Sequence, residues 1–449
     1  MGSFDGLRIG VSGLTAAQRG IEITGQNLAN AGTEGYTRRR VEVADVSWGH
    51  PTLPSNPTYR PGGIEVEGTS RIRDDIEDRA FRAAATQSGA ADVRAEIAAR
   101  AENILGPLEG GTVDSMGDFF TSFEELALDP SDQTSRQRVL AAAEQLTRSL
   151  NDAAQRTQAV RVDIDGRVVQ VVNRIDSLGD QIAVVNGHLM QAAVLGEQPL
   201  TLLDQRDKLL DELSRLTAVT IRKRDTITDV FVGGMPLVRG TEVDAIQLDS
   251  GTPVWASNGR PAVVGGELGA LIEARELTLP SIEATLDNVA STLETSVNDT
   301  HALGFDLNGL PGGAFFSGST AETIAVAAGL TPDGIAASST GNPDDGAHAL
   351  VLADVGDDTS GGLSVSEELL SLAGQLGSSA AAADEARAPA AEYLERAETR
   401  RMETTGVSLD EEMAELIKLQ RAYEASARVV STVDELLDRL INATGRVGL

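Results

Sequence analysis

Both ends of this 449-residue chain carry a heptad pattern of apolar residues. Near the start, steps of four and three residues connect Leu7, Val11, Leu14, Ile21 and Leu28, with polar or glycine positions filling the remaining steps. This spacing places the side chains on one seam of an α-helix. Interior glycines weaken an isolated helix by up to about 1 kcal/mol each. We therefore expect this helix to need packing against other helices.

The last forty residues repeat the pattern over a wider surface. One seam consists of Leu409, Met413, Leu416, Tyr423, Ala427, Val430 and Leu437. A second apolar row beside it includes Ile417, Val429 and Leu436. A two-stranded coiled coil needs only one narrow seam. The sequence therefore predicts that both terminal helices form assembly interfaces and that the last helix has more than one partner.

The segments between the two ends predict a mainly α, multidomain protein with a β-rich insertion. Helical periodicity covers residues 74–105, 112–128, 133–195, 202–216, 267–303 and 365–403. Period-two alternation and a Gly-Gly turn indicate strands after residue 217, and residues 304–364 are rich in Gly, Pro, Asp and Ser. The expected architecture is nested, with terminal coiled-coil helices around a long helical-hairpin domain and a small β-rich domain.

Three discontinuous domains follow from this pattern. The terminal helical domain comprises residues 1–45 and 404–449. The helical rod comprises residues 46–216, beginning with an extended segment, together with 265–303 and 365–403. The β-rich outer domain or insertions comprise residues 217–264 and 304–364.

Composition excludes several classes of function. The formal charge of −31 argues against nucleic acid and against anionic membrane surfaces, both of which require a positive footprint. The charge is uneven: residues 1–73 hold eight basic and seven acidic residues, residues 400–449 hold seven and nine, and the middle carries nearly all the excess. The absence of cysteine excludes disulfides and thiol catalysis. No apolar run is long enough to predict a membrane span.

No catalytic or metal-binding motif is recognisable. The four histidines, His50, His188, His301 and His348, share no ligand spacing. A segment that begins like a calcium loop at Asp306 has Pro311 and Ser317 at two essential positions, so it departs from that motif. We therefore predict a protein that is not an enzyme, with no cofactor, no metal ion and no small-molecule substrate.

One segment near the start resembles the signature of the bacterial flagellar rod, hook and hook-associated proteins. It contains Ser12, Gly13 and Leu14, and then Asn27, Ala29, Asn30, Thr33, Gly35 and Tyr36. The asparagines suit a helix end and the glycine suits the turn that follows. Glu34 stands where the family often has proline. The signature alone indicates an axial flagellar protein.

Three further segments, in order, are similar to the hook-associated protein 1 family, the first hook–filament junction protein. They are residues 202–213 with the sequence Asp204-Gln205-Arg206-Asp207, residues 265–309, and residues 406–437. The resemblance implies a structural role at the junction of hook and filament, in a ring of identical subunits. It implies an extracellular location in the flagellum, reached by type III export without a cleaved signal peptide.

The resemblance also implies partners: the hook protein, the second hook–filament junction protein, and an export chaperone that holds the C-terminal helix. Two alternatives stay open at this point. The signature would also suit another axial protein, such as a hook, rod or second junction protein. Heptad ends would also suit a non-flagellar, secreted coiled-coil structural protein.

Overall fold

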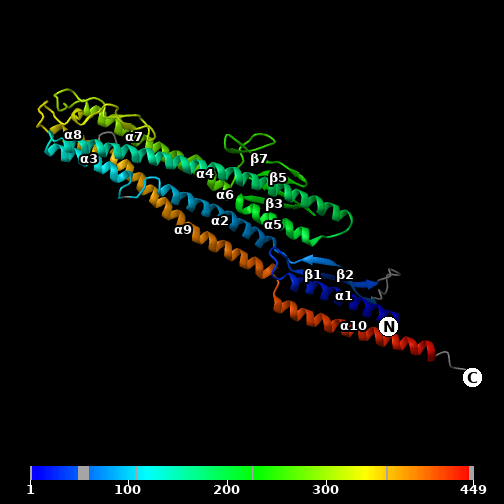
Figure 1. The fold of residues 1–449 in the computed structure, drawn as a ribbon. Helices are drawn as coiled ribbons and strands as arrows, with labels where there is room; N and C mark the ends of the chain where they lie inside the picture. The colour runs from blue at the N-terminus through cyan, green and yellow to red at the C-terminus, as the bar shows by residue number, and fades with distance from the viewer. Residues whose placement is uncertain (1–2, 49–59, 108, 225, 360–362, 444–449) are drawn as a thin grey trace, which may run out of the picture.

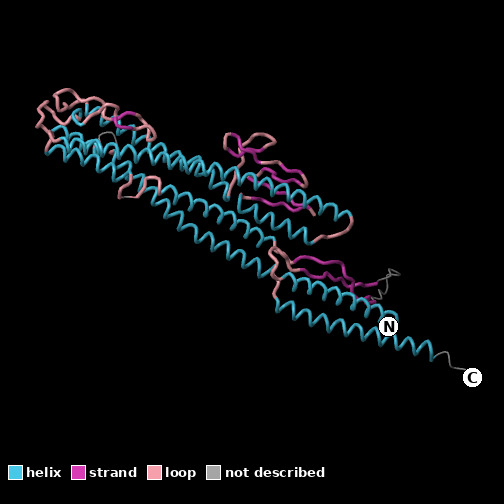
Figure 2. The backbone as a smooth tube through the Cα atoms, viewed as in Figure 1, coloured by secondary structure: helices cyan, strands magenta, loops and turns pink. Residues whose placement is uncertain are grey.

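The computed structural model describes residues 3–48, 60–107, 109–224, 226–359 and 363–443. The molecule is elongated, with two helices side by side at one end and a long helical rod running away from them (Figure 1). Strands occur in three separate places along this length (Figure 2). The expectation of a mainly α protein with β-rich insertions is confirmed.

The first and last helices form an antiparallel pair. They are α1 (Ser3–Asn30) and α10 (Leu409–Ala443), which lie far apart in sequence and side by side in space (Figure 1). A hairpin of β1 (Arg39–Trp48) and β2 (Arg60–Arg71) packs against α1. Its register places Arg39 opposite Arg71 and Val43 opposite Val66. Residues 46–48 and 60–71, which the sequence analysis groups with the rod, thus lie beside the terminal helices.

The rod is built from helices, and the longest of them begin at capping side chains. Its members are α2 (Asp75–Glu102), α3 (Thr112–Leu128), α4 (Gln133–Val194), α5 (Leu200–Leu216), α6 (Gly266–Glu273), α7 (Leu279–His301) and α9 (Val365–Thr405). A π-helical turn, η1 (Ala274–Thr278), joins α6 to α7. Asp74 and Asp132 cap α2 and α4, and Ser364 forms a capping box with Glu367 at the start of α9.

The β-rich segments form two insertions rather than one body. A four-stranded antiparallel sheet lies along α4 and α5, with a two-stranded sheet next to it (Figure 1). The strands are β3 (Val219–Arg224), β4 (Ile227–Val232), β5 (Met235–Arg239), β6 (Glu242–Val243), β7 (Ile246–Asp249) and β8 (Thr252–Trp255).

The second insertion lies at the far end of the rod, around α3 and α7 (Figure 1). It contains β9 (Phe316–Ser317), β10 (Ala325–Val326), the 3-10 turns η2 (Pro332–Gly334) and η3 (Val355–Asp357), and α8 (Ala347–Asp354). Residues 217–264 and 304–364 are therefore separated by much of the length of the rod.

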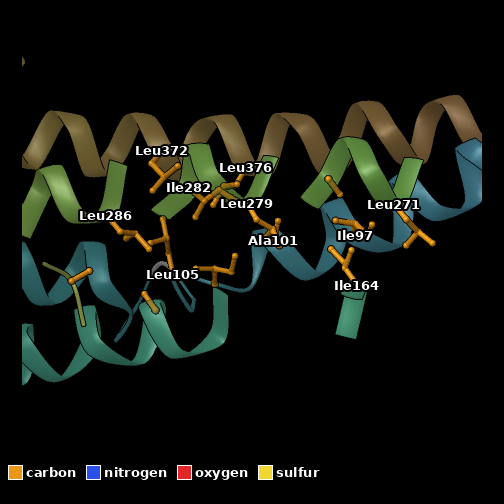
Figure 3. Close-up of a cluster of buried hydrophobic side chains, with 14 of the residues drawn as sticks. Ile97, Ala101, Leu105, Ile164, Leu271, Leu279, Ile282, Leu286, Leu372 and Leu376 are labelled. Carbon is orange, nitrogen blue, oxygen red and sulfur yellow. The ribbon is translucent and has the colours of Figure 1, made fainter. Parts of the chain in front are cut away.

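One continuous hydrophobic core runs through the rod, from Ala90 to Leu376. Figure 3 shows part of it, where α2, α4, α6, α7 and α9 meet around Ile97, Ile164 and Leu279. At the far end, Phe119 and Phe315 pack with neighbouring aromatic rings at centroid distances of 4.9–5.8 Å. Among the described residues, α1 and α10 contribute nothing to this core.

Candidate assembly site

Glycines on α1 form the contact with α10. A Cβ added at Gly10 would lie 2.9 Å from Val430 Cγ2, and one added at Gly13 would lie 2.8 Å from Ser426 Oγ. A Cβ at Gly20 would lie 2.8 Å from a methyl of Leu419. The interior glycines that weaken an isolated helix thus allow the two backbones to approach closely.

The buried stripe of α1 lies beside the seam that the heptad pattern predicts. The buried positions of this helix are mostly small or polar: Gly10, Ala16, Ala17, Gly20, Ile23, Thr24 and Asn27. Leu7, Leu14, Ile21 and Leu28 are only half-buried, and Val11 is 48% exposed. The large aliphatic side chains therefore border the α1–α10 contact instead of filling it.

The predicted seam of α10 divides in the same way. Leu416, Ala427, Val430 and Leu437 are half-buried beside α1. Leu409, Met413 and Tyr423 face solvent, with exposed fractions of 54%, 46% and 38%. Three further apolar residues of α10, Ile417, Val429 and Leu436, are also exposed. Such a concentration of exposed large apolar side chains on one helix is typical of an interaction surface.

Asn27 of the signature connects three segments of the chain. Its side-chain oxygen accepts hydrogen bonds from the Tyr36 hydroxyl (2.8 Å) and the Arg39 backbone N–H (3.0 Å). Its amide group donates to the Arg39 carbonyl (2.9 Å) and to Glu412 Oε2 of α10 (3.0 Å). Burial raises the pKa of Tyr36, which keeps its hydroxyl protonated as a donor.

The other signature residues shape the turn that follows α1 or bind the hairpin that packs against this helix. The Thr33 backbone N–H donates to the Asn30 carbonyl at 2.9 Å, and Gly35 has a φ of +82°, which favours glycine. Ser12 accepts a hydrogen bond from the Ile64 N–H of the hairpin at 3.2 Å. Ala29 is exposed.

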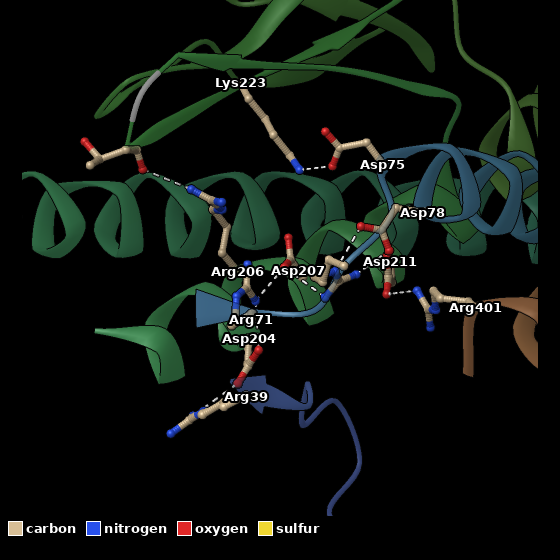
Figure 4. A network of polar contacts seen from close by, with 12 residues as sticks. Arg39, Arg71, Asp75, Asp78, Asp204, Arg206, Asp207, Asp211, Lys223 and Arg401 are labelled. Carbon is tan, nitrogen blue, oxygen red and sulfur yellow. Dashed lines mark hydrogen bonds and ion pairs between the residues drawn. The ribbon is translucent and has the colours of Figure 1, made fainter. Parts of the chain in front are cut away.

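A cluster of ion pairs, which we call the joint, connects the terminal helices to the rod (Figure 4). Its acidic members are three aspartates on one face of α5: Asp204, Asp207 and Asp211. Its basic members come from the hairpin, the following linker, α2 and α9: Arg39, Arg71, Arg73, Arg82 and Arg401. The contacts therefore join segments that are distant in sequence at the place where the rod meets the terminal pair.

Asp207 lies at the centre of the joint. Its carboxylate is 2.9 Å from Arg71 Nη1 and 2.9 Å from Arg73 Nη1, and its side chain is 6% exposed. Burial alone would raise the pKa of Asp207, but Arg73, Arg71, Arg82 and Arg206 outweigh it and hold the pKa below its usual value. Arg401 completes the joint from α9, with its guanidinium 2.6 Å from Asp211 and 3.6 Å from the ring centroid of Phe81.

Sequence reasoning noted residues 202–213 only as a resemblance and did not find the joint. The signal was present, because Asp204, Asp207 and Asp211 are spaced by three and four and so share a helix face. Glu412 was also missed, since a carboxylate in an acidic stretch usually faces water. The glycines of α1, which weaken an isolated helix, are the positions at which α10 approaches closely.

Two histidines at the far end of the rod make hydrogen bonds to the backbone. His301 is fully buried, with Nδ1 2.7 Å from the Gly313 carbonyl and Nε2 accepting from the Ala336 N–H at 2.9 Å. His348 Nε2 lies 2.8 Å from the Thr300 carbonyl. His188 is exposed, and His50 lies outside the described residues. In the part of the chain that the structure describes, no three His, Asp or Glu side chains are placed to share a metal ion.

None of the described helices combines the length and hydrophobicity needed to cross a bilayer.

Sequence families match at the three parts of the molecule described above. The family described as flagellar hook-associated protein FlgK helical domain matches residues 98–316, which form most of the rod. The families described as flagella basal body rod protein and flagellar basal body rod FlgEFG protein C-terminal match residues 7–37 and 398–443, which include most of α1 and α10.

Curated relatives carry one shared name. Flagellar hook-associated protein 1 of Bacillus subtilis is 28% identical over 501 aligned residues, with 99% of each chain covered. The chain is a homologue of flagellar hook-associated protein 1 over nearly all of its length. It is therefore a structural component of the bacterial flagellum, of the kind that joins hook and filament, and it assembles with other axial components of that extracellular appendage.

Other members of the family are longer than this chain. The Escherichia coli and Salmonella typhimurium proteins of the same name are 29% and 28% identical over 68% of this chain, which spans 59% and 58% of their lengths. The fold is shared with a solved structure, the flagellar hook junction protein FlgK from Burkholderia pseudomallei. That structure matches with a TM-score of 0.65 and 16% identity, covering 72% of this chain and 99% of its own.

Proposed function

We propose that this protein forms a ring of identical subunits at the hook–filament junction, in which the α1–α10 pairs of neighbouring copies pack side by side. The axial unit would comprise residues 1–45 and 404–449, together with the hairpin that packs against α1. The hook protein and the second hook–filament junction protein would be its neighbours along the axis. The rod would carry the acidic surface that faces solvent.

The observation that carries this proposal is the position of the large apolar side chains. On the α1 side, glycines make the close contacts with α10, where they face Val430, Ser426 and Leu419. Val11, Met413 and Ile417 are each between 46% and 48% exposed. Burying an exposed aliphatic side chain contributes about 1.5–3 kcal/mol, so covering this surface with other copies would be favourable.

The charge distribution supports the same arrangement. Residues 1–73 and 400–449 are almost neutral, whereas residues 74–399 carry nearly all of the net charge of −31. Repulsion between identical neighbours in a ring would be small at the terminal helices. A strongly acidic middle would keep the exposed part of the assembly soluble.

The exposed face of α10 would serve a second role before assembly. We propose that an export chaperone covers this face, and that the protein leaves the cell through the flagellar type III apparatus without a cleaved signal peptide. An amphipathic helix with an exposed apolar face is a common binding element for such a partner. We also propose that the protein has no catalytic activity, because the buried His301 and His348 are engaged in hydrogen bonds to the backbone.

A charge placed on the exposed face of α10 tests the proposal. Met413→Asp, expressed in cells that lack the native protein, should leave hooks without filaments and should release unattached flagellin into the medium. The variant protein should itself appear in the medium if only assembly has failed. Its retention inside the cell would instead indicate that the chaperone or the export step needs this face.

Val162→Asp is the matched control, because Val162 is an aliphatic residue of the rod that is 61% exposed. Cells carrying this variant should assemble normal filaments. Normal filaments on cells carrying Met413→Asp would rule out the proposed packing of α10. If cells carrying either variant lost their filaments to the same extent, the terminal pair would not be the principal interface.

A further inference from the structure

A buried carboxylate lies at one end of the contact between α1 and α10. The Glu412 side chain is 3% exposed. Its Oε2 accepts from the Asn27 amide at 3.0 Å, and its Oε1 accepts from Arg38 Nε at 2.7 Å. Arg38 also contacts the exposed Glu411 at 2.8 Å, and its backbone N–H donates to the Thr405 carbonyl at 3.1 Å. Glu412 is thus anchored to the end of α1, through Asn27, and to the segment just before β1, through Arg38.

The glycine contacts alone do not define how the two helices are aligned along their axes. Gly6, Gly13 and Gly20 of α1 face Val433, Ser426 and Leu419 of α10. The glycines recur every seven residues, so a slip of one heptad would again place glycines against side chains of α10. The close approach of the backbones would survive such a slip.

The same slip would separate Glu412 from its partners. It would place Gly6 opposite Ser426, Gly13 opposite Leu419 and Glu412 opposite Gly20. The carboxylate would then be buried against a glycine that offers no side-chain donor, and Asn27 would lose an acceptor. A buried charge without its partner is strongly unfavourable, so the slipped alignment is selected against.

We propose that Glu412 is the residue that determines the register of the α1–α10 pair, through its contacts with Asn27 and Arg38. A single buried polar residue can fix the alignment of a helix pair whose apolar contacts are permissive. Glu412 is a positioning residue: it aligns the half-buried seam of α1 with the exposed face of α10. Only this consequence for assembly rests on the proposed function, because the register itself is a property of one chain.

The absence of cysteine allows the register to be measured by disulfide formation. A Cβ at position 13 would lie 3.7 Å from Ser426 Cβ, within the range for a disulfide. Gly13→Cys with Ser426→Cys therefore reports the native register. Gly6→Cys with Ser426→Cys reports the slipped one, because seven residues of helix separate positions 6 and 13 by about 10 Å.

The measurement is the yield of intramolecular disulfide under mild oxidation of the purified full-length protein at low concentration. With Glu412 present, the native pair should exceed the slipped pair by about a hundredfold, the ratio expected for loss of a buried ion pair. In Glu412→Leu, the yield of the native disulfide should exceed that of the slipped disulfide by no more than about tenfold, because the slipped disulfide forms more often. Glu412→Gln keeps an acceptor for Asn27 and should restore part of the selectivity.

Glu424→Leu is the matched control, because Glu424 is an exposed glutamate of the same helix. In this variant, the ratio of native to slipped disulfide should equal the ratio measured with the native residue at position 424. An unchanged ratio in Glu412→Leu would overturn the assignment. Loss of both disulfides would also overturn it, because Glu412 would then be needed for pairing and not for register. Since no assembly is involved, these outcomes are independent of the filament test with Met413→Asp.

Discussion

The rod and the terminal pair are both helical, yet they bury different kinds of residue. In the rod, large side chains such as Phe119, Leu146 and Leu286 are at most 1% exposed and pack against one another. In the terminal pair, glycines form the contact and large aliphatic side chains remain at its border. The rod closes its core within one chain, whereas the terminal pair leaves apolar surface uncovered.

This difference separates folding from assembly. A core of large residues contributes most of the stability of a domain, because each buried side chain removes a large apolar area from water. The glycines of α1 remove little apolar area of their own from water, and they let α10 side chains such as Val430 and Leu419 come close to the α1 backbone. The rod therefore has the composition of a domain that folds alone, and the terminal pair has the composition of a surface that other subunits complete.

The first prediction compares one large residue from each region. Phe119→Ala should destabilise the protein by about 3–5 kcal/mol, because Phe119 is fully buried among aromatic rings. Ile21→Ala should cost less than about 1 kcal/mol in the monomer, because Ile21 is only half-buried. Urea unfolding of the two variants measures both values. A cost for Ile21→Ala close to that for Phe119→Ala would show that the terminal pair is already complete in the monomer.

The second prediction addresses the joint between the two regions. Asp207→Asn should cost about 3–5 kcal/mol, because it leaves Arg71 and Arg73 without their central carboxylate in a buried site. Glu212→Gln, also on α5, removes an exposed ion pair with Arg174 and should cost less than about 1 kcal/mol. Urea unfolding again provides the measurement. If the two variants lost the same free energy of unfolding, water would have to reach the ion pairs of the joint.

Much of the helical architecture could be predicted from sequence. The helical runs predicted over residues 112–128 and 133–195 correspond to α3, which ends at Leu128, and to α4, which begins at Gln133. Hydrophobic periodicity and turn residues are local signals, and they were strong at these positions. The assignment of the family also depended on local motifs, and the comparisons confirm it.

The side of α1 that faces α10 could not be predicted. The apolar heptad marks Leu14 and Ile21 as the seam, since large residues usually face the partner helix. The structure instead buries Gly10 and Gly20, which face Val430 and Leu419 of α10 at close approach. The joint was missed for a similar reason: Asp207 and Arg71 are distant in sequence, and no local pattern pairs them.

The third prediction concerns pH and the far end of the rod. Burial lowers the pKa of His301, with His348 and Asp306 as the nearby charged groups. The unfolded chain therefore binds more protons than the folded one below about pH 6.5, and stability falls as the pH decreases through that value. One proton limits the slope to about 1.4 kcal/mol per pH unit.

Urea unfolding between pH 7 and pH 5 measures this dependence. His301→Gln should remove the part of it that His301 contributes, although the variant is less stable at every pH. His188→Gln is the control, because His188 is exposed and should leave the dependence unchanged. A pH dependence that His301→Gln does not alter would exclude this histidine as its origin.

The fourth prediction compares two glycines of α1. Gly25→Ala should stabilise the helix by up to about 1 kcal/mol, because nothing lies within 4 Å of the added Cβ. Gly10→Ala gains the same helix propensity, but its Cβ would lie 2.9 Å from Val430 Cγ2 and 3.4 Å from the Val430 backbone N. A β-branched side chain and a backbone atom yield little, so this variant should weaken the pair. Hydrogen exchange of the α10 amides measures pairing, with protection rising in Gly25→Ala and falling in Gly10→Ala. A rise in both would show that the glycines are incidental to the approach of the two helices.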